Sequence, residues 1–395
     1  MCSISVRHFA TTRAGGAGTA MKRLDRALNQ LSDVSSGITT LYEGKYSTGY
    51  LRYILNHIPI ADKLLFNQLD QKFTPTWLPQ ISYPDPGTDV VHLHWVAGFL
   101  SPNTIEKINS PIVWTLHDMW PLTGGCHYAK NCNRFSHHCE HCPALGSTTQ
   151  NDISNKQFRA FQDALAEKEI YYIAPSEWIA TKAEESAVVD GPVETIPNCL
   201  DIRQFKPIDQ ALARKELSIP VESNVVLTGG IDINDQRKGG DLLVKSLHHL
   251  KEQINTEKTI VMTFGSDSIE NVPFETRSLG WVDSDKLPYI YSSADVMAVP
   301  SRYDNLPQIA TEPIACGTPV VAFDTGGLSD IVIDGKTGFL VSEYDCYEFS
   351  SRLYYLLSNM GKAEKFGKFA RQHAVTSWSF EHIARKHHQL YSSIH

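Results

Sequence analysis

The sequence of 395 residues lacks any apolar run of the length that crosses a membrane. Its longest mostly uncharged apolar stretch, residues Val90 to Leu100, is interrupted by His92 and His94 and is shorter than the ~18 to 20 residues that a span needs. The first twenty residues contain no apolar core of signal-peptide length, so they do not indicate export. We therefore predict a cytoplasmic protein.

Long blocks of lysine or arginine are also absent. The 36 Lys and Arg residues are outnumbered by 44 Asp and Glu residues, which gives a formal net charge of −8. This balance argues against nucleic acid as a partner, although a local phosphate site is compatible with it. Low-complexity tracts are missing too, and the 42% hydrophobic and 20% charged residues exclude a disordered or collagen-like chain.

Short apolar runs rich in β-branched residues alternate with segments of helical spacing. The expected strands are Asp89 to Leu93, Ile112 to Leu116, Tyr171 to Ala174, Val225 to Thr228, Thr259 to Phe264, Val296 to Val299 and Val320 to Phe323. Leucines recur at helical spacing in residues 241–250 and 351–360. The alternation predicts an α/β fold in which helices cover both faces of parallel sheets.

The length suggests two large domains at roughly 150 residues per domain. A segment with two prolines and little periodicity, residues 195–207, is the expected hinge. We expect one Rossmann-like domain over residues 1–195, a second over 196–375, and a terminal helix in 376–395. Open parallel sheets bind ligands beyond the carboxyl ends of their strands, so two such domains would place an active site in the cleft between them.

The strongest motif runs from Val299 to Ile331 and reads VPSRYDNLPQIATEPIACGTPVVAFDTGGLSDI. A loop after a strand holds Asp304, and a helix expected to start at Asn305 to Pro307 would offer free backbone N–H groups to an anion. The carboxylate of Glu312 suits the paired hydroxyls of a ribose. The residues alone also allow a solvated Asp and a helix-capping Glu.

A second motif follows the expected strand 225–228. Arg237 and Lys238 stand immediately before a glycine and a helix, which places two cations beside a helix N-terminus and suits a diphosphate. For Arg237 the alternative is an ordinary surface charge.

Histidine residues end two expected strands. His117, followed by Asp118, ends the strand 112–116, where it could hydrogen-bond a bound sugar with Asp118 orienting its ring. His94 ends the preceding strand, and for it a functional and a structural role are equally open.

Four cysteines, Cys126, Cys132, Cys139 and Cys142, lie close together within a loop expected at residues 124–146. The spacing of the last two is that of a zinc knuckle, and four thiolates could close a tetrahedral structural zinc site. The alternative is a set of reduced or reversibly oxidised thiols.

Taken together these motifs resemble the family 4 retaining glycosyltransferases, which have the GT-B fold. The resemblance extends to a glycine loop of Gly15, Gly16 and Gly18, to Ala174–Trp178 (APSEW), and to a closing helix around Trp378. The HDMWP segment followed by a cysteine-bearing loop resembles the branch of colanic acid and related exopolysaccharide transferases. Asp304 departs from the usual Glu, and the usual Arg after the first glycine of the second motif is missing.

The resemblance implies transfer of a sugar from a nucleoside diphosphate sugar to a saccharide or lipid-linked saccharide, with retention of configuration and with no cofactor required for catalysis. It implies roles in catalysis for His117, Lys238 and Asp304, in donor binding for Arg237, Asn305, Leu306 and Glu312, and in acceptor binding for Gly15, Gly16 and Gly18. An epimerase or phosphorylase on the same fold, or a non-catalytic sugar-nucleotide-binding scaffold, is the alternative. Lys22, Arg23 and Arg26 on the first helix could contact an anionic membrane surface, or form a solvated face.

Overall fold

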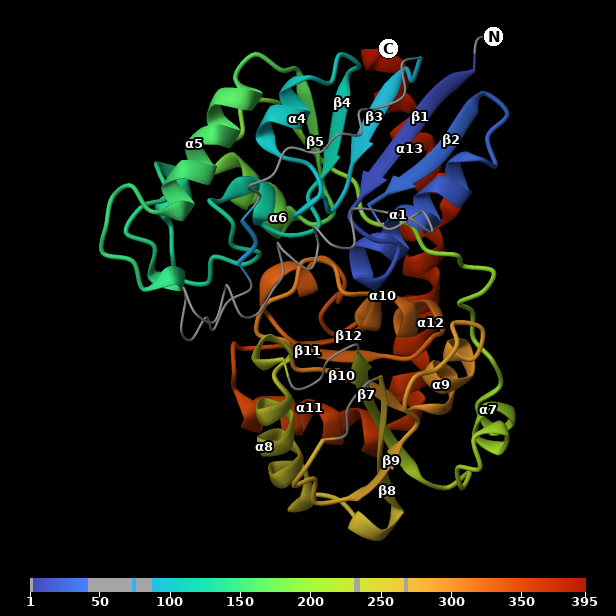
Figure 1. The fold of residues 1–395 in the computed structure, drawn as a ribbon. Coiled ribbons are helices and arrows are strands. Elements are labelled where there is room, and N and C mark those ends of the chain that lie inside the picture. Colours follow the sequence, from blue (N-terminus) through green and yellow to red (C-terminus); the bar gives the residue numbers. More distant parts are fainter. Residues whose placement is uncertain (1–2, 42–72, 76–86, 231–234, 266–268) are drawn as a thin grey trace. The chain divides into compact units, whose positions relative to one another are not determined.

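A computed structural model describes residues 3–41, 73–75, 87–230, 235–265 and 269–395. The chain divides into two units (Figure 1). Unit 1 consists of Met1–Asn198 with the returning segment Ile383–His395, and unit 2 consists of Cys199–His382. The predicted domain boundary at residue 195 lies three residues before the point where the chain leaves unit 1.

Unit 1 contains a parallel sheet of six strands in the order β2-β1-β3-β4-β5-β6. Its strands are β1 (Ile4–Ala10), β2 (Val34–Thr40), β3 (Val90–Leu93), β4 (Ile112–Thr115), β5 (Ile170–Ala174) and β6 (Val193–Thr195). The direction in which successive strands are added reverses between β1 and β3. In open α/β sheets, ligands bind beyond the carboxyl ends of the strands at such a switch point.

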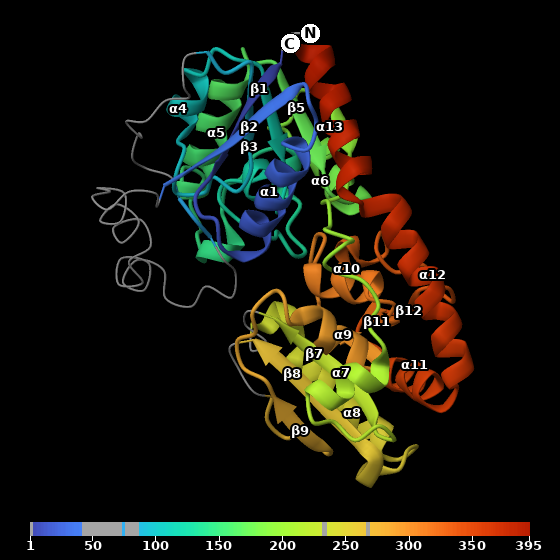
Figure 2. The same ribbon diagram turned by 90° about the vertical axis from the view of Figure 1, so that its right-hand side faces the viewer.

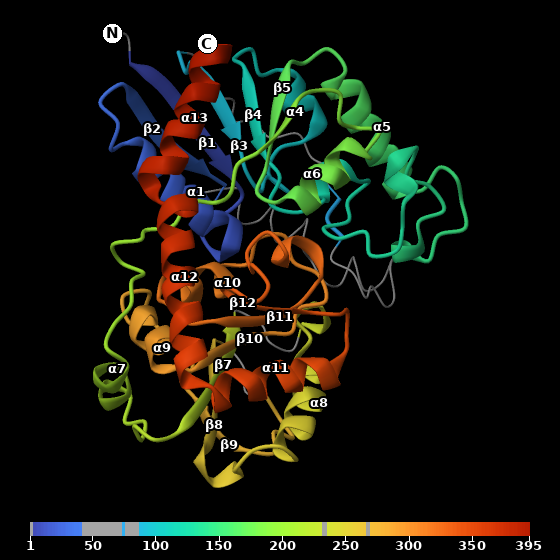
Figure 3. The same cartoon turned by 180° about the vertical axis from the view of Figure 1, so that it is seen from behind.

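The helices of unit 1 cover both faces of this sheet. They are α1 (Gly15–Leu28), α4 (Pro102–Glu106), α5 (Ile153–Leu165), α6 (Glu177–Glu184) and α13 (Phe380–Ile394), with 3-10 helices η1 (Trp120–Leu122), η2 (Arg134–Ser136) and η3 (Pro143–Leu145). One core packs Trp114 and Tyr172 of the strands against Phe158 and Phe161 of α5. Helix α13, coloured red in Figure 3, lies over strands β1 and β3, and its Tyr391 hydroxyl bonds to His92 of β3.

Unit 2 contains a second parallel sheet of six strands in the order β12-β11-β10-β7-β8-β9. Its strands are β7 (Asn224–Gly230), β8 (Thr259–Gly265), β9 (Glu275–Ser278), β10 (Val296–Val299), β11 (Val320–Phe323) and β12 (Gly338–Val341). Renumbered within the unit, the order is 3-2-1-4-5-6 from the opposite edge, which is the Rossmann order. The switch point of this sheet lies between β7 and β10.

Alternate residues along the unit 2 strands enter two separate cores. The helices are α7 (Gln210–Glu216), α8 (Gly240–Lys251), α9 (Leu287–Ser293), α10 (Gln308–Ala315), α11 (Cys346–Ser358) and α12 (Met360–Trp378), with 3-10 helices η4 (Gln236–Lys238), η5 (Thr256–Lys258) and η6 (Gly326–Leu328). Val225 and Leu227 pack with residues of α9, α10 and α12, whereas Val226 packs with α8 and α11. Helix α7 lies beside α9 (Figure 2).

Polar side chains fix where many of these helices begin. Ser101, Asp152, Ser176, Asp209 and Asp345 each accept a hydrogen bond from a backbone N–H in the first turn of the helix that follows. An N-cap of this kind satisfies a backbone donor that has no partner within the helix. The predicted helices 241–250 and 351–360 correspond to α8 and α11, and the second begins five residues before its predicted start.

The basic face predicted for the first helix is corrected by the structure. Arg23 is buried, with 9% of its surface exposed, and at helical spacing it lies beside the buried Ala20 and Ala27 of α1. Only Arg26 of the three predicted cations is fully exposed. The three side chains therefore do not form one solvent-facing basic patch. None of the helices in the described part of the chain combines the length and apolar character that crossing a membrane requires.

Candidate functional site

The cationic motif and the acidic motif of unit 2 follow the two strands that flank its switch point. Arg237 and Lys238 lie after β7, and Asp304 lies after β10. The two loops are joined through their backbones, since the N–H of Arg302 donates to the carbonyl of Arg237 at 2.8 Å. The fold thus brings together residues that are 66 positions apart in the sequence.

Both cations converge on one carboxylate oxygen. Lys238 Nζ lies 2.5 Å from Asp304 Oδ2, and Arg237 Nη1 lies 3.1 Å from the same atom. Arg237 also donates to the carbonyl of Tyr303 at 3.1 Å. Asp304 is buried, with 8% of its surface exposed, so its charge is balanced by the two cations rather than by water.

The protonation of these groups follows from burial and pairing. Burial on its own raises the pKa of Asp304, but the charges of Lys238 and Arg237 outweigh it and the net pKa lies below the ordinary value. Burial lowers the pKa of Lys238, and the neighbouring Asp304 partly reverses that effect. We infer an ionised carboxylate and two cations at neutral pH, which leaves one net positive charge among these three groups.

Two glycines allow the loops of this site to approach each other. Gly239 has a φ of +69°, and a Cβ there would lie 2.0 Å from the carbonyl oxygen of Pro300. Gly326 has a φ of +58°, and its Cβ would lie 2.1 Å from the carbonyl oxygen of Asp304. The N–H of Gly327 donates to that same oxygen at 2.9 Å. Side chains at positions 239 and 326 would therefore force the Lys238 and Asp304 loops to move.

The helix of the acidic motif starts later than predicted. Helix α10 begins at Gln308 with Pro307 as its N-cap residue, so Asn305 lies before the helix and does not start it. The backbone N–H of Asn305 instead donates to the Asp304 carboxylate and contributes to its lowered pKa. Leu306, predicted to bind the donor, is 8% exposed and belongs to a core of unit 2.

Glu312 occupies the buried interior of α10. It is 3% exposed, and its Oε2 accepts a hydrogen bond of 2.7 Å from the hydroxyl of Tyr291 on α9. Tyr291 was not among the predicted site residues. It stands in an apolar helix whose sequence carries no signal that its hydroxyl meets a carboxylate, and only the packing of α9 on α10 reveals the pair.

The glycine loop of unit 1 opens helix α1 after strand β1. At Gly15 and Gly16 no heavy atom of the described residues lies within 4 Å of the position of an added Cβ, and Gly15 has a φ of +73°. A Cβ on Gly18 would lie 2.4 Å from the backbone of Arg13. The loop itself therefore requires glycine at position 18, whereas a side chain at position 15 or 16 would meet no described neighbour.

His117 lies just beyond β4 and is partly exposed. Its Nε2 is hydrogen-bonded to Nδ1 of His94 at 2.9 Å. Burial lowers the pKa of His117 to about 4, although the charge of Asp118 opposes this shift. The ring is therefore neutral at neutral pH and can act as a hydrogen-bond donor at one nitrogen and an acceptor at the other.

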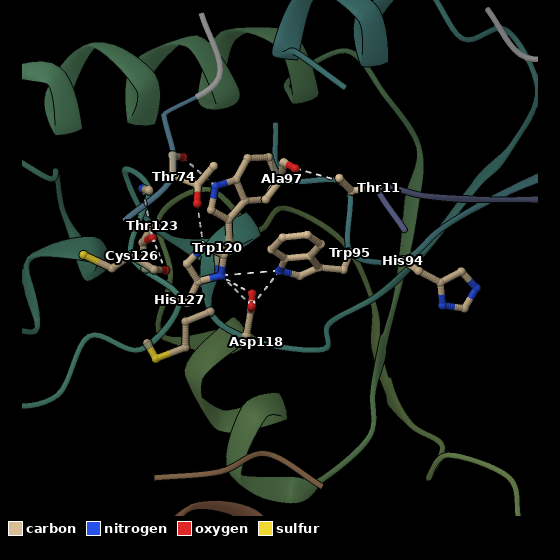
Figure 4. A network of polar contacts seen from close by, with 12 residues as sticks. Thr11, Thr74, His94, Trp95, Ala97, Asp118, Trp120, Thr123, Cys126 and His127 are labelled. Atoms are coloured by element: carbon tan, nitrogen blue, oxygen red, sulfur yellow. Dashed lines mark hydrogen bonds and ion pairs between the residues drawn. The ribbon is translucent and has the colours of Figure 1, made fainter. Parts of the chain in front are cut away.

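Asp118 was predicted to orient the ring of His117, and the structure gives it other partners. Its Oδ2 accepts hydrogen bonds from Nδ1 of His127 at 2.6 Å and from Nε1 of Trp95 at 2.9 Å (Figure 4). His127 Nε2 in turn bonds to the hydroxyl of Thr74 at 2.9 Å. The His94 ring points away from this network in Figure 4, so Asp118 orients His127 while His94 holds His117.

The four loop cysteines have free thiols. A hydrogen bond with Cys126 lowers the pKa of Cys142 to about 6, and burial raises the pKa of Cys139 to about 12. Among the described residues, three or more candidate ligand atoms within 4.8 Å of one another occur at His8, His92 and His94, but not at the thiols. A tetrahedral zinc site would need the thiols to draw closer, so zinc on this loop stays a prediction.

Two parallel α/β sheets, each with polar side chains beyond the strand ends at its switch point, are the architecture of the GT-B glycosyltransferases. Comparison with known proteins supports this class. Residues 209–373 match the family model of glycosyl transferases group 1. A D-inositol 3-phosphate glycosyltransferase of Catenulispora acidiphila is 32% identical over 329 residues, covering 78% of this chain and 72% of that protein. The chain therefore belongs to the glycosyl transferases group 1.

Solved structures agree on the fold. Sucrose-phosphate synthase of Thermosynechococcus elongatus superposes with a TM-score of 0.70 at 19% identity, covering 99% of this chain and 98% of that one. HepE of Anabaena in complex with UDP-glucose superposes with a TM-score of 0.64 at 15% identity, covering 99% of this chain and 100% of that one. The GT-B fold predicted from the sequence is confirmed.

Proposed function

We propose that this glycosyltransferase moves a sugar from a nucleoside diphosphate sugar to an acceptor hydroxyl with retention of anomeric configuration. The observation that carries the proposal is the convergence of Lys238 and Arg237 on the buried Asp304 at the switch point of unit 2. Negative charge builds up on the departing diphosphate during transfer, and two fixed cations stabilise that charge. Without a donor, Asp304 offsets one of the two positive charges.

We assign roles to the other predicted residues on the same basis. Asp304 and His117 would hold the donor sugar, and Glu312 would hold the nucleotide from a position fixed by Tyr291. The space beside the Cα atoms of Gly15 and Gly16 would help to place the acceptor. Leu306 would shape the donor site only through the core beneath it.

UDP-sugars are the donors to test first, because HepE of Anabaena was solved with UDP-glucose. Two acceptor classes deserve comparison. The relatives named D-inositol 3-phosphate glycosyltransferases suggest an inositol phosphate. The cysteine-bearing loop favours a saccharide of cell-surface polysaccharide synthesis, which can be lipid-linked.

A thermal-shift screen of UDP, GDP, ADP and their glucose conjugates tests the donor. A ligand present at 100 times its Kd stabilises the folded state by about 2.7 kcal/mol, so the matching nucleotide should raise the melting temperature in a dose-dependent way. The matching donor is then incubated with glucosides and with inositol phosphate, and NMR spectroscopy identifies the anomer formed. A product of inverted configuration, or no response to any nucleotide, would refute the proposal.

A further inference from the structure

Unit 1 contains a chain of three hydrogen-bonded imidazole rings that leads from His117 into the core. His117 Nε2 lies 2.9 Å from His94 Nδ1, and His94 Nε2 lies 2.9 Å from His8 Nδ1. His8 belongs to β1, His94 follows β3 and His117 follows β4, so the chain crosses three neighbouring strands at the switch point. His8 is 0% exposed and His94 is 2% exposed.

All three rings are neutral at neutral pH. Burial lowers the pKa of His8 to about 3 and that of His117 to about 4, and it lowers the pKa of His94 well below 6.5. The groups that face them are mainly other imidazoles: His92 and His387 lower the pKa values further, as does Arg7 at His8, while Asp118 raises that of His117. No ring therefore carries two protons.

Neutral rings leave only two ways to arrange the protons. Each ring has one N–H, and each of the two contacts needs one proton, so every N–H along the chain must point in the same direction. In one arrangement His8 carries its proton on Nε2. In the other, His8 Nδ1 donates to His94, and His94 Nδ1 donates to His117.

The buried end of the chain decides between them. His8 Nε2 is buried and has no hydrogen-bond partner among the residues that the structure describes. A buried N–H without an acceptor is rarer in proteins than a buried acceptor without a donor, because the donor loses its only hydrogen bond. His8 Nε2 is therefore the atom without a proton, and His8 donates through Nδ1.

We propose that His8 and His94 are positioning residues that fix His117 in the tautomer protonated on Nδ1. His117 then offers an N–H donor at Nδ1 and has no basic nitrogen there. On the function proposed above, such a donor suits a hydroxyl or other oxygen of the bound sugar, and it is unsuited to removing a proton.

A metal ion on His8, His92 and His94 is the competing interpretation, since their nitrogens lie within 4.8 Å of one another. The hydrogen bonds observed engage five of the six ring nitrogens, with Tyr391 and Thr115 bonded to His92. No carboxylate belongs to the group, so a dication in this buried place would lack a balancing charge. The hydrogen-bonded chain accounts for the geometry better.

The test is a long-range ¹H–¹⁵N correlation spectrum of the full chain labelled on histidine, with the His117 signals assigned by their loss in a His117→Asn variant. We expect a protonated Nδ1 and a bare Nε2 on His117. A protonated Nε2, or a bound metal ion that is kept in Cys142→Ser and lost in His92→Phe, would overturn the proposal. This measurement needs no substrate, so it stands apart from the proposed function.

Matched variants extend the test to activity. His8→Phe removes the donor at the end of the chain, and His92→Phe removes an equally buried imidazole that lies outside it. We expect His8→Phe to give a mixed His117 tautomer and about tenfold lower kcat for UDP-glucose with little change in KM. His92→Phe should leave the tautomer unchanged, and His8→Asn, whose amide can donate from the place of Nδ1, should restore most of kcat.

Equal effects of both Phe variants on the His117 signals would contradict the proposal. If the variants do not fold, the wild-type spectrum still decides, and lack of UDP-glucose turnover by the wild type would bear only on the proposed function.

Discussion

Replacing Lys238 with methionine and Asp304 with asparagine should change the affinity for UDP in opposite directions. Lys238 Nζ is bonded to Asp304 Oδ2 at 2.5 Å, so a diphosphate must compete with this carboxylate for the cation. A hydrogen bond to a charged group contributes about 1.5 to 3 kcal/mol. Lys238→Met should therefore raise the Kd for UDP roughly 10- to 100-fold. Asp304→Asn removes the competing charge at nearly constant volume and should lower the Kd up to about tenfold.

Titration calorimetry with UDP measures both changes, and Lys245→Met is the matched control because Lys245 is an exposed lysine on α8. Turnover separates the two roles further. Asp304→Asn should reduce kcat although it binds UDP more tightly, since Asp304 is proposed to hold the sugar. The reasoning fails if Lys238→Met binds UDP like the wild type, or if both substitutions weaken binding to the same extent.

Three further predictions concern stability and metal. Gly239→Ala should destabilise the protein by about 1 to 3 kcal/mol more than Gly335→Ala, as measured by urea unfolding. Both positions have a positive φ, but only a Cβ at position 239 would meet a backbone oxygen, that of Pro300. Equal losses of unfolding free energy in the two variants would contradict the close packing. The buried histidines have pKa values below 6.5 in the folded state, so the unfolded state binds protons first as the pH falls. Each such ring should therefore lower the free energy of unfolding by about 1.4 kcal/mol per pH unit below 6.5. An unchanged free energy of unfolding between pH 7 and pH 5 would refute this prediction. If the loop thiols bind zinc as predicted, elemental analysis should find one ion per chain, lost in Cys142→Ser and kept in Cys346→Ser, and a metal-free wild type would reject the site.

The sequence predicted seven of the twelve strands in the described residues and missed the interior strand β1 and the edge strands β2, β6, β9 and β12. Strand β1 (ISVRHFA) was missed because Ser5, Arg7 and His8 interrupt its apolar run. All seven predicted strands are present, because buried parallel strands are continuous apolar runs. Strands β2 (VSSGITT) and β9 (ETRS) were missed since they are polar and partly exposed at sheet edges, where pairing with a neighbour rather than apolar periodicity determines the conformation.

In the candidate site, too, the sequence predicted some features and missed others. Lys238 and Asp304 could be placed in one site from the sequence because each follows a recognisable strand, and such strands end at the same edge of a sheet. The partners of Asp118 could not be predicted from the sequence, because His127 contacts it from a loop and Trp95 contacts it from the end of another strand. The hydrogen-bonded histidines from His117 to His8 could not be predicted either. Hydrogen bonds between side chains of neighbouring parallel strands depend on the strand register, which a single sequence does not reveal.

The return of residues 383–395 to unit 1 has a consequence for synthesis on the ribosome. Unit 2 is continuous in the sequence, whereas unit 1 waits for the last residues of the chain although its sheet is translated first. Until Tyr391 emerges, the nascent sheet carries the imidazole of His92 without one of its two hydrogen-bond partners. A stop codon in place of Tyr391, which removes the last turn of α13, should therefore damage the half of the protein that was made earliest.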